Sequence, residues 1–143
     1  MVIGARSRRS WLTLAAVAAV TLVCPPAALL AQFGHPLKGQ GSGEGGARTN
    51  ANRVLLDFDW DGKEITGRIN PGAGEATVKS VTFDYTNPAS WGVKVQAEGK
   101  DATGKALPIS IDGKLENIGA YVRHFHGTWT QGSQKGPFSV TRN

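Results

Sequence analysis

Residues 53–70 read RVLLDFDWDGKEITGRIN, two short segments of alternating apolar and polar residues on either side of an Asp-Gly pair. In the first segment, apolar residues occupy every second position from Val54 to Trp60. Successive side chains of a strand point to opposite faces, so this alternation predicts a strand with one buried face. Asp61 and Gly62 both tolerate the positive φ of a tight turn, so the whole stretch predicts a β-hairpin.

The same pattern continues to the end of the chain. A second Asp-Gly pair, Asp112-Gly113, is expected to turn the chain in the same way. Eight short strands at this spacing predict an all-β domain. We favour a small antiparallel up-and-down barrel over a β-sandwich, because closure of the sheet removes exposed edge strands. After the first hairpin, strands are expected at 76–85, 91–98, 107–111, 115–118, 121–130 and 138–142.

The first 31 residues have the pattern of a secretory signal peptide. Three arginines precede an apolar run at residues 11–23, and two prolines then lead to small residues and an expected cleavage after Ala31. Arg8-Arg9 followed by Trp11-Leu12 resembles a twin-arginine export signal, with the Sec route as the alternative. The sequence therefore predicts an exported bacterial protein, periplasmic or extracellular, that meets the membrane only through this signal during export.

The signal also accounts for most of the net charge. The chain of 143 residues has a formal charge of +5, from 16 Lys+Arg and 11 Asp+Glu. Three of the basic residues lie in the signal, so the remainder carries about +2 and has no basic cluster of the kind that binds nucleic acid. The single cysteine, Cys24, also lies in the signal, so packing alone is expected to stabilise the exported domain.

A glycine-rich segment, residues 32–52, lies between the signal and the first hairpin. We interpret it as a flexible arm or a loose first strand. The predicted organisation is therefore a signal peptide at 1–31, an arm at 32–52 and a β-barrel domain at 53–143.

Two histidines, His124 and His126, lie in the predicted strand YVRHFHGTWT. They share its outer face, roughly 7 Å apart from the rise per residue. A tight metal site needs three or four ligands, so two solvated histidines are the preferred interpretation and no cofactor is expected. Further ligands would have to come from His35 in the arm or from Asp57, Asp59 or Glu116 on other strands.

The run Asp57-Phe58-Asp59-Trp60-Asp61-Gly62 matches the opening of an EF-hand loop. That loop needs a bidentate glutamate at its twelfth position, and the twelfth residue here is Arg68. Calcium binding is therefore not expected.

Large aromatic residues are the third candidate for a site. The rings either fill the core, which we favour, or line a ligand cavity, and the candidates are Trp60, Trp91, Tyr121 and Trp129.

Catalysis has little support, because the chain has no nucleophile elbow, phosphate-binding loop or exported cysteine. The preferred function is a non-enzymatic binding module for a small ligand or a protein partner. The alternative is a metal-binding protein or metal-dependent enzyme that uses the His-x-His pair.

Several motifs resemble those of an uncharacterised family of small secreted bacterial proteins: HPLKG at 35–39, WDGKEITGRINPG at 60–72, IDGKLEN at 111–117 and GTWTQG at 127–132. The resemblance implies export and assigns no activity. Gly39-Gln40-Gly41 stands where such relatives have Gly-x-Trp, so the role of that tryptophan is not carried over. The Gly-Thr-Trp strand and Arg142 are also faintly similar to lipocalin and avidin-type barrels, which implies a fold and no ligand.

Overall fold

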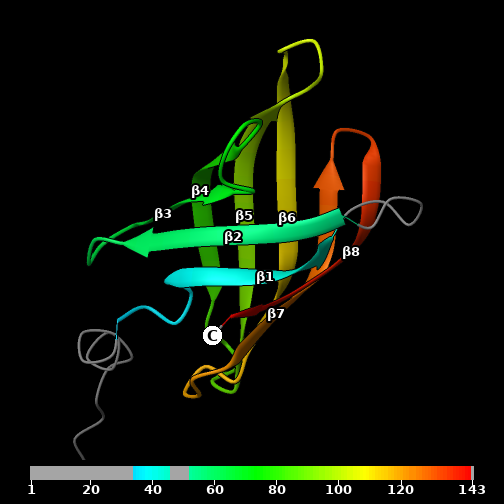
Figure 1. The fold of residues 1–143 in the computed structure, drawn as a ribbon. Helices are drawn as coiled ribbons and strands as arrows, with labels where there is room; N and C mark the ends of the chain where they lie inside the picture. Colours follow the sequence, from blue (N-terminus) through cyan, green and yellow to red (C-terminus); the bar gives the residue numbers. More distant parts are fainter. Residues whose placement is uncertain (1–33, 46–51, 143) are drawn as a thin grey trace, which may run out of the picture.

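The computed structural model describes residues 34–45 and 52–142, and all regular structure in these residues is β (Figure 1). Every strand pairs antiparallel with its neighbours in sequence, and the first strand pairs with the last, so the sheet closes into a barrel. This confirms the predicted all-β up-and-down barrel. The strands are β1 (Gly39–Gly45), β2 (Asn52–Trp60), β3 (Ile65–Ile69), β4 (Ala76–Asp84), β5 (Ser90–Lys100), β6 (Ala106–Glu116), β7 (Arg123–Gln131) and β8 (Gln134–Arg142).

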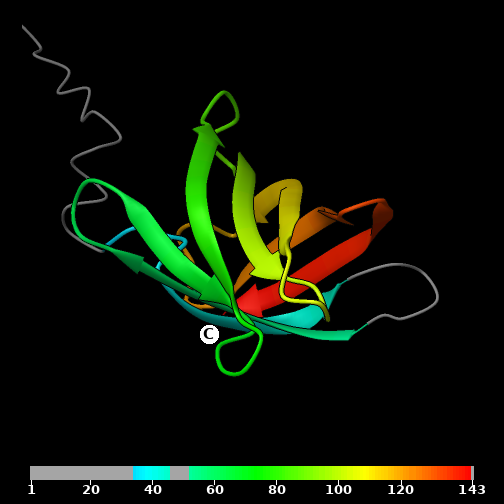
Figure 2. The ribbon, with the colours of Figure 1, turned by 90° about the horizontal axis from the view of Figure 1, so that it is seen from above.

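The barrel encloses a single apolar core made by the alternating inner residues of the strands. Val93, Val95 and Ile111 are wholly buried at its centre. Figure 2, seen from above, shows the strands surrounding this interior. Burial of each such side chain is worth roughly 1.5–3 kcal/mol, which explains how a barrel without cysteine is stabilised.

The segment predicted as an arm contributes a strand of the barrel. Residues 39–45, GQGSGEG, form β1, which pairs with β2 on one side and β8 on the other. Its inner face carries only glycine, which leaves room for the large inner side chains of the neighbouring strands. At Gly45, for example, a Cβ would lie 3.1 Å from the side chains of both Phe138 and Val54. The alternative of a first strand is therefore correct, and a barrel domain starting at residue 53 is wrong because β1 closes the sheet.

The turn predicted at Asp112-Gly113 is also wrong. β6 runs without interruption through this pair, so the strands expected at 107–111 and 115–118 are one. Gly113 lies directly opposite Gly127 on β7, and a Cβ on Gly127 would overlap the Asp112 carbonyl oxygen and Gly113 Cα. Glycine is required at 113 by the close approach of two backbones. The total of eight strands is right because β1 replaces the strand lost by this merger.

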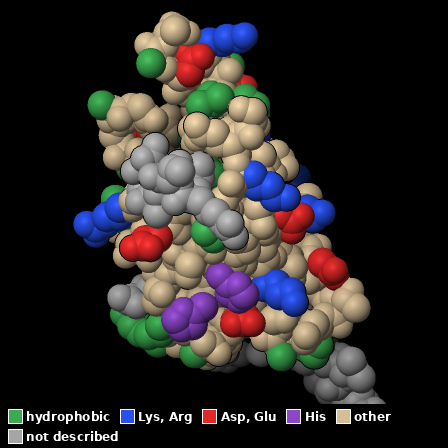
Figure 3. All heavy atoms as spheres, turned by 90° about the vertical axis from the view of Figure 1, so that its right-hand side faces the viewer, with side chains coloured by type: hydrophobic (Ala, Val, Ile, Leu, Met, Phe, Trp, Pro, Cys, Tyr) green, Lys and Arg blue, Asp and Glu red, His purple; other side chains and the backbone are tan. Residues whose placement is uncertain are grey.

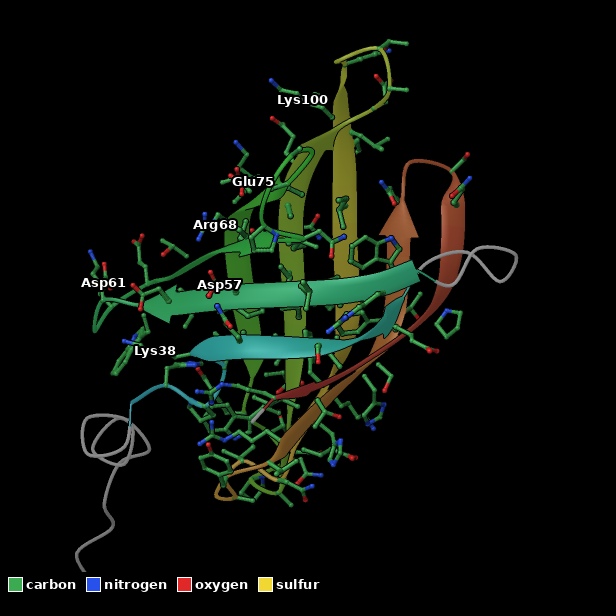
Figure 4. All side chains as sticks on the ribbon, in the orientation of Figure 1. Lys38, Asp57, Asp61, Arg68, Glu75 and Lys100 are labelled. Carbon is green, nitrogen blue, oxygen red and sulfur yellow. The ribbon has the colours of Figure 1, made fainter. Side chains whose placement is uncertain are left out.

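The predicted β2–β3 hairpin is confirmed. Asp61 Oδ1 accepts hydrogen bonds from the backbone N–H groups of Lys63 and Glu64, both at 2.8 Å, and Gly62 has a φ of 101°. The acidic run is thus a strand followed by a capped turn. Arg68, at the position an EF-hand reserves for glutamate, pairs with Asp57 at 3.1 Å and with Glu75 at 3.7 Å (Figure 4).

The predicted signal peptide, residues 1–31, lies outside the described residues. Within residues 34–45 and 52–142 there is no helix long and apolar enough to cross a bilayer.

Candidate functional site

His35, Pro36 and Leu37, which the exposed Lys38 separates from β1, are buried and form a plug for one end of the barrel. His35 is 6 % exposed and Leu37 is 3 % exposed. A tight turn holds the plug, because the Leu37 N–H donates to His35 Nδ1 at 3.1 Å and the Lys38 N–H donates to the His35 carbonyl at 2.9 Å. The sequence placed His35 in a flexible arm, from which it could reach the His-x-His pair as a further metal ligand. That placement is wrong, because its ring is packed into the barrel.

His35 lies at the centre of an aromatic cluster. Its ring centroid is 4.7 Å from that of Phe83, 5.8 Å from Trp60 and 6.0 Å from Trp91. Tyr85 completes the cluster, with its ring 4.7 Å from Trp91 and 5.6 Å from Phe83. We call these five residues the aromatic cluster. They come from the plug, β2, β5 and the end of β4.

Burial, and to a smaller extent the positive charge of Arg123, together lower the pKa of His35 from 6.5 to about 4. The imidazole is therefore neutral near pH 7. Because Nδ1 accepts the Leu37 N–H, the ring proton must reside on Nε2. No described residue accepts a hydrogen bond from Nε2, so this N–H of the aromatic cluster is an unused donor.

Two arginines hold the plug in place. Arg123 on β7 and Arg142 on β8 are direct cross-strand partners, and both donate to the Pro36 carbonyl, at 3.1 Å and 2.9 Å. Arg123 Nε also donates to the Ile118 carbonyl at 3.1 Å. Gly39 gives Arg142 its room, since a Cβ there would lie 2.7 Å from the guanidinium. Burial lowers the pKa of Arg123, as expected for a cation that no carboxylate of the described residues approaches.

The barrel wall is incomplete beside the aromatic cluster. β3 pairs with β4 at only two positions, Arg68 with Thr77 and Ile69 with Ala76. Figure 1 shows that β3 meets β4 at its arrowhead and that its other end lies far to the side. A bulge at Lys79, between Val78 and Ser80, shifts the register of β4 on β5 just past this contact. We call the opening between residues 65–67 of β3 and residues 79–84 of β4 the β3–β4 slot.

The β3–β4 slot opens into a hollow of about 590 Å³. Cavities that hold small ligands are typically about 300–1,000 Å³ and mostly apolar, with a few polar groups. Lys63, Glu64, Lys79 and Ser80 lie among the lining residues as its polar groups. The apolar and aromatic lining comes from His35, Trp60, Ile65, Val81, Phe83 and Tyr85.

The four aromatic residues predicted to bind a ligand fall in three places. Trp60 lines the hollow, and Trp91, 8 % exposed, lies behind it in the aromatic cluster. Trp129 is buried in the core, stacked on Phe138 with centroids 6.2 Å apart. Tyr121 is 81 % exposed, and its predicted inward orientation is wrong. A turn over residues 117–120 precedes β7, which begins only at Arg123, so the strand alternation does not extend back to residue 121.

His35, Ile65 and Phe83 were not predicted as ligand-binding residues. Alternation did predict that Phe83 and Tyr85 share a face, but nothing local indicates that β3 leaves this face uncovered. The plug motif HPL was visible, and its apolar Leu37, two residues after the histidine, is the signal that it packs inward.

His124 and His126 lie on the outer face of β7, as predicted, and Figure 3 shows histidine side chains together with acidic and basic neighbours on this surface. His126 Nε2 is 3.3 Å from Glu116 Oε2, and His124 Nδ1 is 3.3 Å from Thr141 Oγ1. Lys114 is the direct cross-strand partner of His126 and brings a positive charge to the pair. Within the described chain, no three His, Cys, Asp or Glu side chains are grouped to hold a metal ion.

A second hollow of about 520 Å³ lies beside His126 on the outer surface of β4 to β7. Lys94 and Asp112, two of its charged residues, are paired with each other at 3.3 Å. Phe83 and His126 are its only ring-bearing residues, whereas His35, Trp60, Phe83 and Tyr85 all line the β3–β4 slot. We therefore take the slot as the stronger candidate for a binding site.

Comparisons with protein families, with characterised proteins and with solved structures found no match to this chain. The resemblance to a family of small secreted proteins therefore stays a prediction, and the site is interpreted from its own geometry.

Proposed function

We propose that this protein is an exported, non-enzymatic binding protein whose ligand places apolar groups in the β3–β4 slot. The observation that carries the proposal is the hollow of about 590 Å³, lined by rings and branched aliphatic side chains, at the point where the barrel wall is interrupted. A barrel without a bound partner leaves this apolar lining in contact with water. A ligand that covers it gains roughly 25 cal/mol for each Å² of apolar surface removed from water.

The partial exposure of the lining side chains to solvent supports a site that exists before the ligand binds. Ile65, Val81 and Phe83 are only partly buried although they pack against the core, and Tyr85 is 46 % exposed. The His35 ring is buried with a lowered pKa, and the Leu37 N–H donates to its Nδ1, so its Nε2–H is oriented before a ligand acceptor arrives. Preformed sites of this kind bind with a smaller entropic cost than sites that must be ordered.

Export to the periplasm or the cell exterior belongs to the same proposal. Its support is the arginine-rich start, the apolar run at residues 11–23 and the expected cleavage after Ala31. Amino-terminal sequencing of the protein recovered from the periplasmic fraction tests it. A mature chain that begins near residue 32 is the expected result, and retention of the first 31 residues contradicts it.

The binding proposal is tested by titrating the purified protein with anilinonaphthalene sulfonate, a dye that fluoresces in apolar cavities. We expect one saturable site whose occupancy also changes tryptophan fluorescence, because Trp60 lines the hollow. Tyr85→Ala should weaken binding, since this ring lines the slot. Tyr121→Ala is the matched control, because its ring is 81 % exposed and lies outside the slot.

Equal binding to both tyrosine variants, or no saturable binding at all, contradicts the proposal. Stoichiometric zinc or copper in the purified protein that is lost in a His124→Ala/His126→Ala double variant would favour the alternative of a metal-binding protein.

A further inference from the structure

We infer that the ligand of the β3–β4 slot is an extended peptide segment that enters as an additional strand between β3 and β4. This inference rests on the proposed function and adds the class of ligand. It follows from the backbone groups at the two edges of the slot, which are hydrogen-bonding groups that a compact apolar molecule would leave without partners.

The edge of β3 presents unpaired backbone groups to the slot. The Asn70 N–H donates to the Leu55 carbonyl of β2 at 2.7 Å, so Asn70 is turned toward β2. In an antiparallel pair, alternate residues direct both backbone groups to the same neighbour. Ile69, Gly67 and Ile65 therefore direct theirs away from β2. Ile69 faces Ala76 in the short β3–β4 ladder, but Gly67 and Ile65 have no cross-strand partner on that side among the described residues.

The edge of β4 that faces the slot also presents unpaired backbone N–H and C=O groups. From Ser80 to Asp84 this strand is paired with β5 on one side, and its ladder with β3 ends at Thr77 on the other. Alternate residues over this stretch direct their backbone groups into the slot. Residues 79–84 extend for about 20 Å at the usual rise of a strand. This length matches a guest strand of about six residues.

Side chains of the guest strand would alternate between the hollow and solvent. The inward positions meet Ile65, Val81 and Phe83, so they favour valine, isoleucine or phenylalanine. The charged lining residues are Lys63, Lys79 and Glu64, and Lys79 is already paired with Glu98 at 3.8 Å, so the outward positions suit polar side chains of either charge. Addition of a strand to an exposed sheet edge is a general mode of peptide recognition, in which the backbone gives affinity and alternate side chains give specificity.

A flexible chain fits this slot better than the edge of another folded sheet. The unpaired edges of β3 and β4 face each other across the opening, and each borders the wall of the same barrel. A single extended peptide is able to pair with both edges, whereas a folded sheet would bring further strands that collide with one wall or the other. A second copy of this chain is therefore not the expected occupant.

The experiment uses a hexapeptide with acetyl and amide caps, in which valine and phenylalanine alternate with threonine and glutamate. Its binding to the purified protein is measured by calorimetry and by displacement of anilinonaphthalene sulfonate. We expect saturable binding and slowed hydrogen exchange of the Ile65 and Gly67 amides. The control is the same peptide methylated on alternate backbone nitrogens. It keeps its side chains but loses N–H groups that would donate hydrogen bonds to one of the two flanking strands. We expect it to bind at least about tenfold more weakly, because each lost bond weakens binding severalfold.

A variant of the protein provides a second arm. Ile65→Pro removes an N–H that faces the slot and leaves the ladder of β2 with residues 66 and 68 intact. Ile65→Ala is its control, because it loses the same lining side chain but keeps the N–H. We expect the peptide to bind more weakly to Ile65→Pro than to Ile65→Ala, while the dye binds both variants equally. Equal affinity for the methylated and unmethylated peptides, or no change in exchange at Ile65 and Gly67, overturns the inference. If the dye binds in a Tyr85-dependent way but the peptide does not displace it, the peptide inference fails and the proposed function stands. If neither binds, both fail.

Discussion

Acidification should destabilise this barrel through the buried imidazole of His35. The side chain is 6 % exposed, and burial together with the Arg123 guanidinium lowers its pKa from 6.5 to about 4. In the unfolded chain the same group has its ordinary pKa of about 6.5. Between these two values the unfolded chain binds a proton that the folded barrel does not, so the free energy of unfolding falls as the pH falls.

The magnitude follows from the two pKa values. One pKa unit corresponds to about 1.4 kcal/mol. The fall from 6.5 to about 4 therefore removes about 3 kcal/mol of stability on going from about pH 7 to about pH 4. Exposed carboxylates also contribute to acid destabilisation, because hydrogen bonds lower the pKa of groups such as Asp101. The effect of His35 is therefore measured as a difference between two proteins.

Urea unfolding followed by tryptophan fluorescence, at several pH values between about 4 and 7.5, gives this free energy for the wild type and for His35→Asn. Asparagine keeps an acceptor for the Leu37 N–H and does not titrate. The difference in unfolding free energy between the two proteins should change by about 3 kcal/mol over this range. His124→Asn controls for the loss of a histidine from the outer surface. A difference between wild type and His35→Asn that stays constant with pH would refute the claim that the plug holds this ring neutral.

Three further predictions concern stability and are tested by the same unfolding measurement. Gly43→Ala should cost about 1–3 kcal/mol or prevent folding, because a Cβ there overlaps the backbone of β8; Ser42→Ala, on the exposed outer face of β1, should have little effect. Phe138→Ala, at a residue 2 % exposed, should cost about 3–5 kcal/mol, whereas Tyr121→Ala should lie within about 0.5 kcal/mol of the wild type. Arg68→Ala should cost less than about 1 kcal/mol, since its ion pairs are exposed, and high salt should abolish the difference; a larger or salt-independent cost would show that Arg68 has another role.

The parts of the fold that were predictable from sequence are those with a local cause. Side-chain alternation predicts the β2–β3 hairpin, because Val54, Leu56 and Phe58 need a common buried face and Asp61-Gly62 suits a turn. β1 was harder to recognise, since its inner residues are glycines and contribute no apolar signal. Glycine at every second position is nevertheless a period of two, and it indicates a strand whose inner face must be empty.

The parts that were not predictable depend on residues far apart in sequence. Asp112-Gly113 resembles a turn, but Gly113 is required by the backbone of Gly127 on the next strand. The β3–β4 slot exists because a bulge at Lys79 and a two-residue ladder separate two strands that are adjacent in sequence. Burial of His35 likewise depends on rings from three different strands. Such features follow from register, and no local pattern specifies register across the whole barrel.

Closure of the barrel through β1 has a consequence for the order of folding. Gly41 pairs with Arg142 across about 100 positions of the chain, and contacts this distant in sequence form slowly because a long loop must first close. The hairpins from β2 to β7 are all local and are able to form one after another on a nascent chain. The seam between β1 and β8 must wait until β8 has emerged from the ribosome. Glycine on the inner face of β1 makes closure of the barrel easier, because the closing strand has no inward side chains to pack. Only the backbone hydrogen bonds between β1 and its two neighbours remain to be formed.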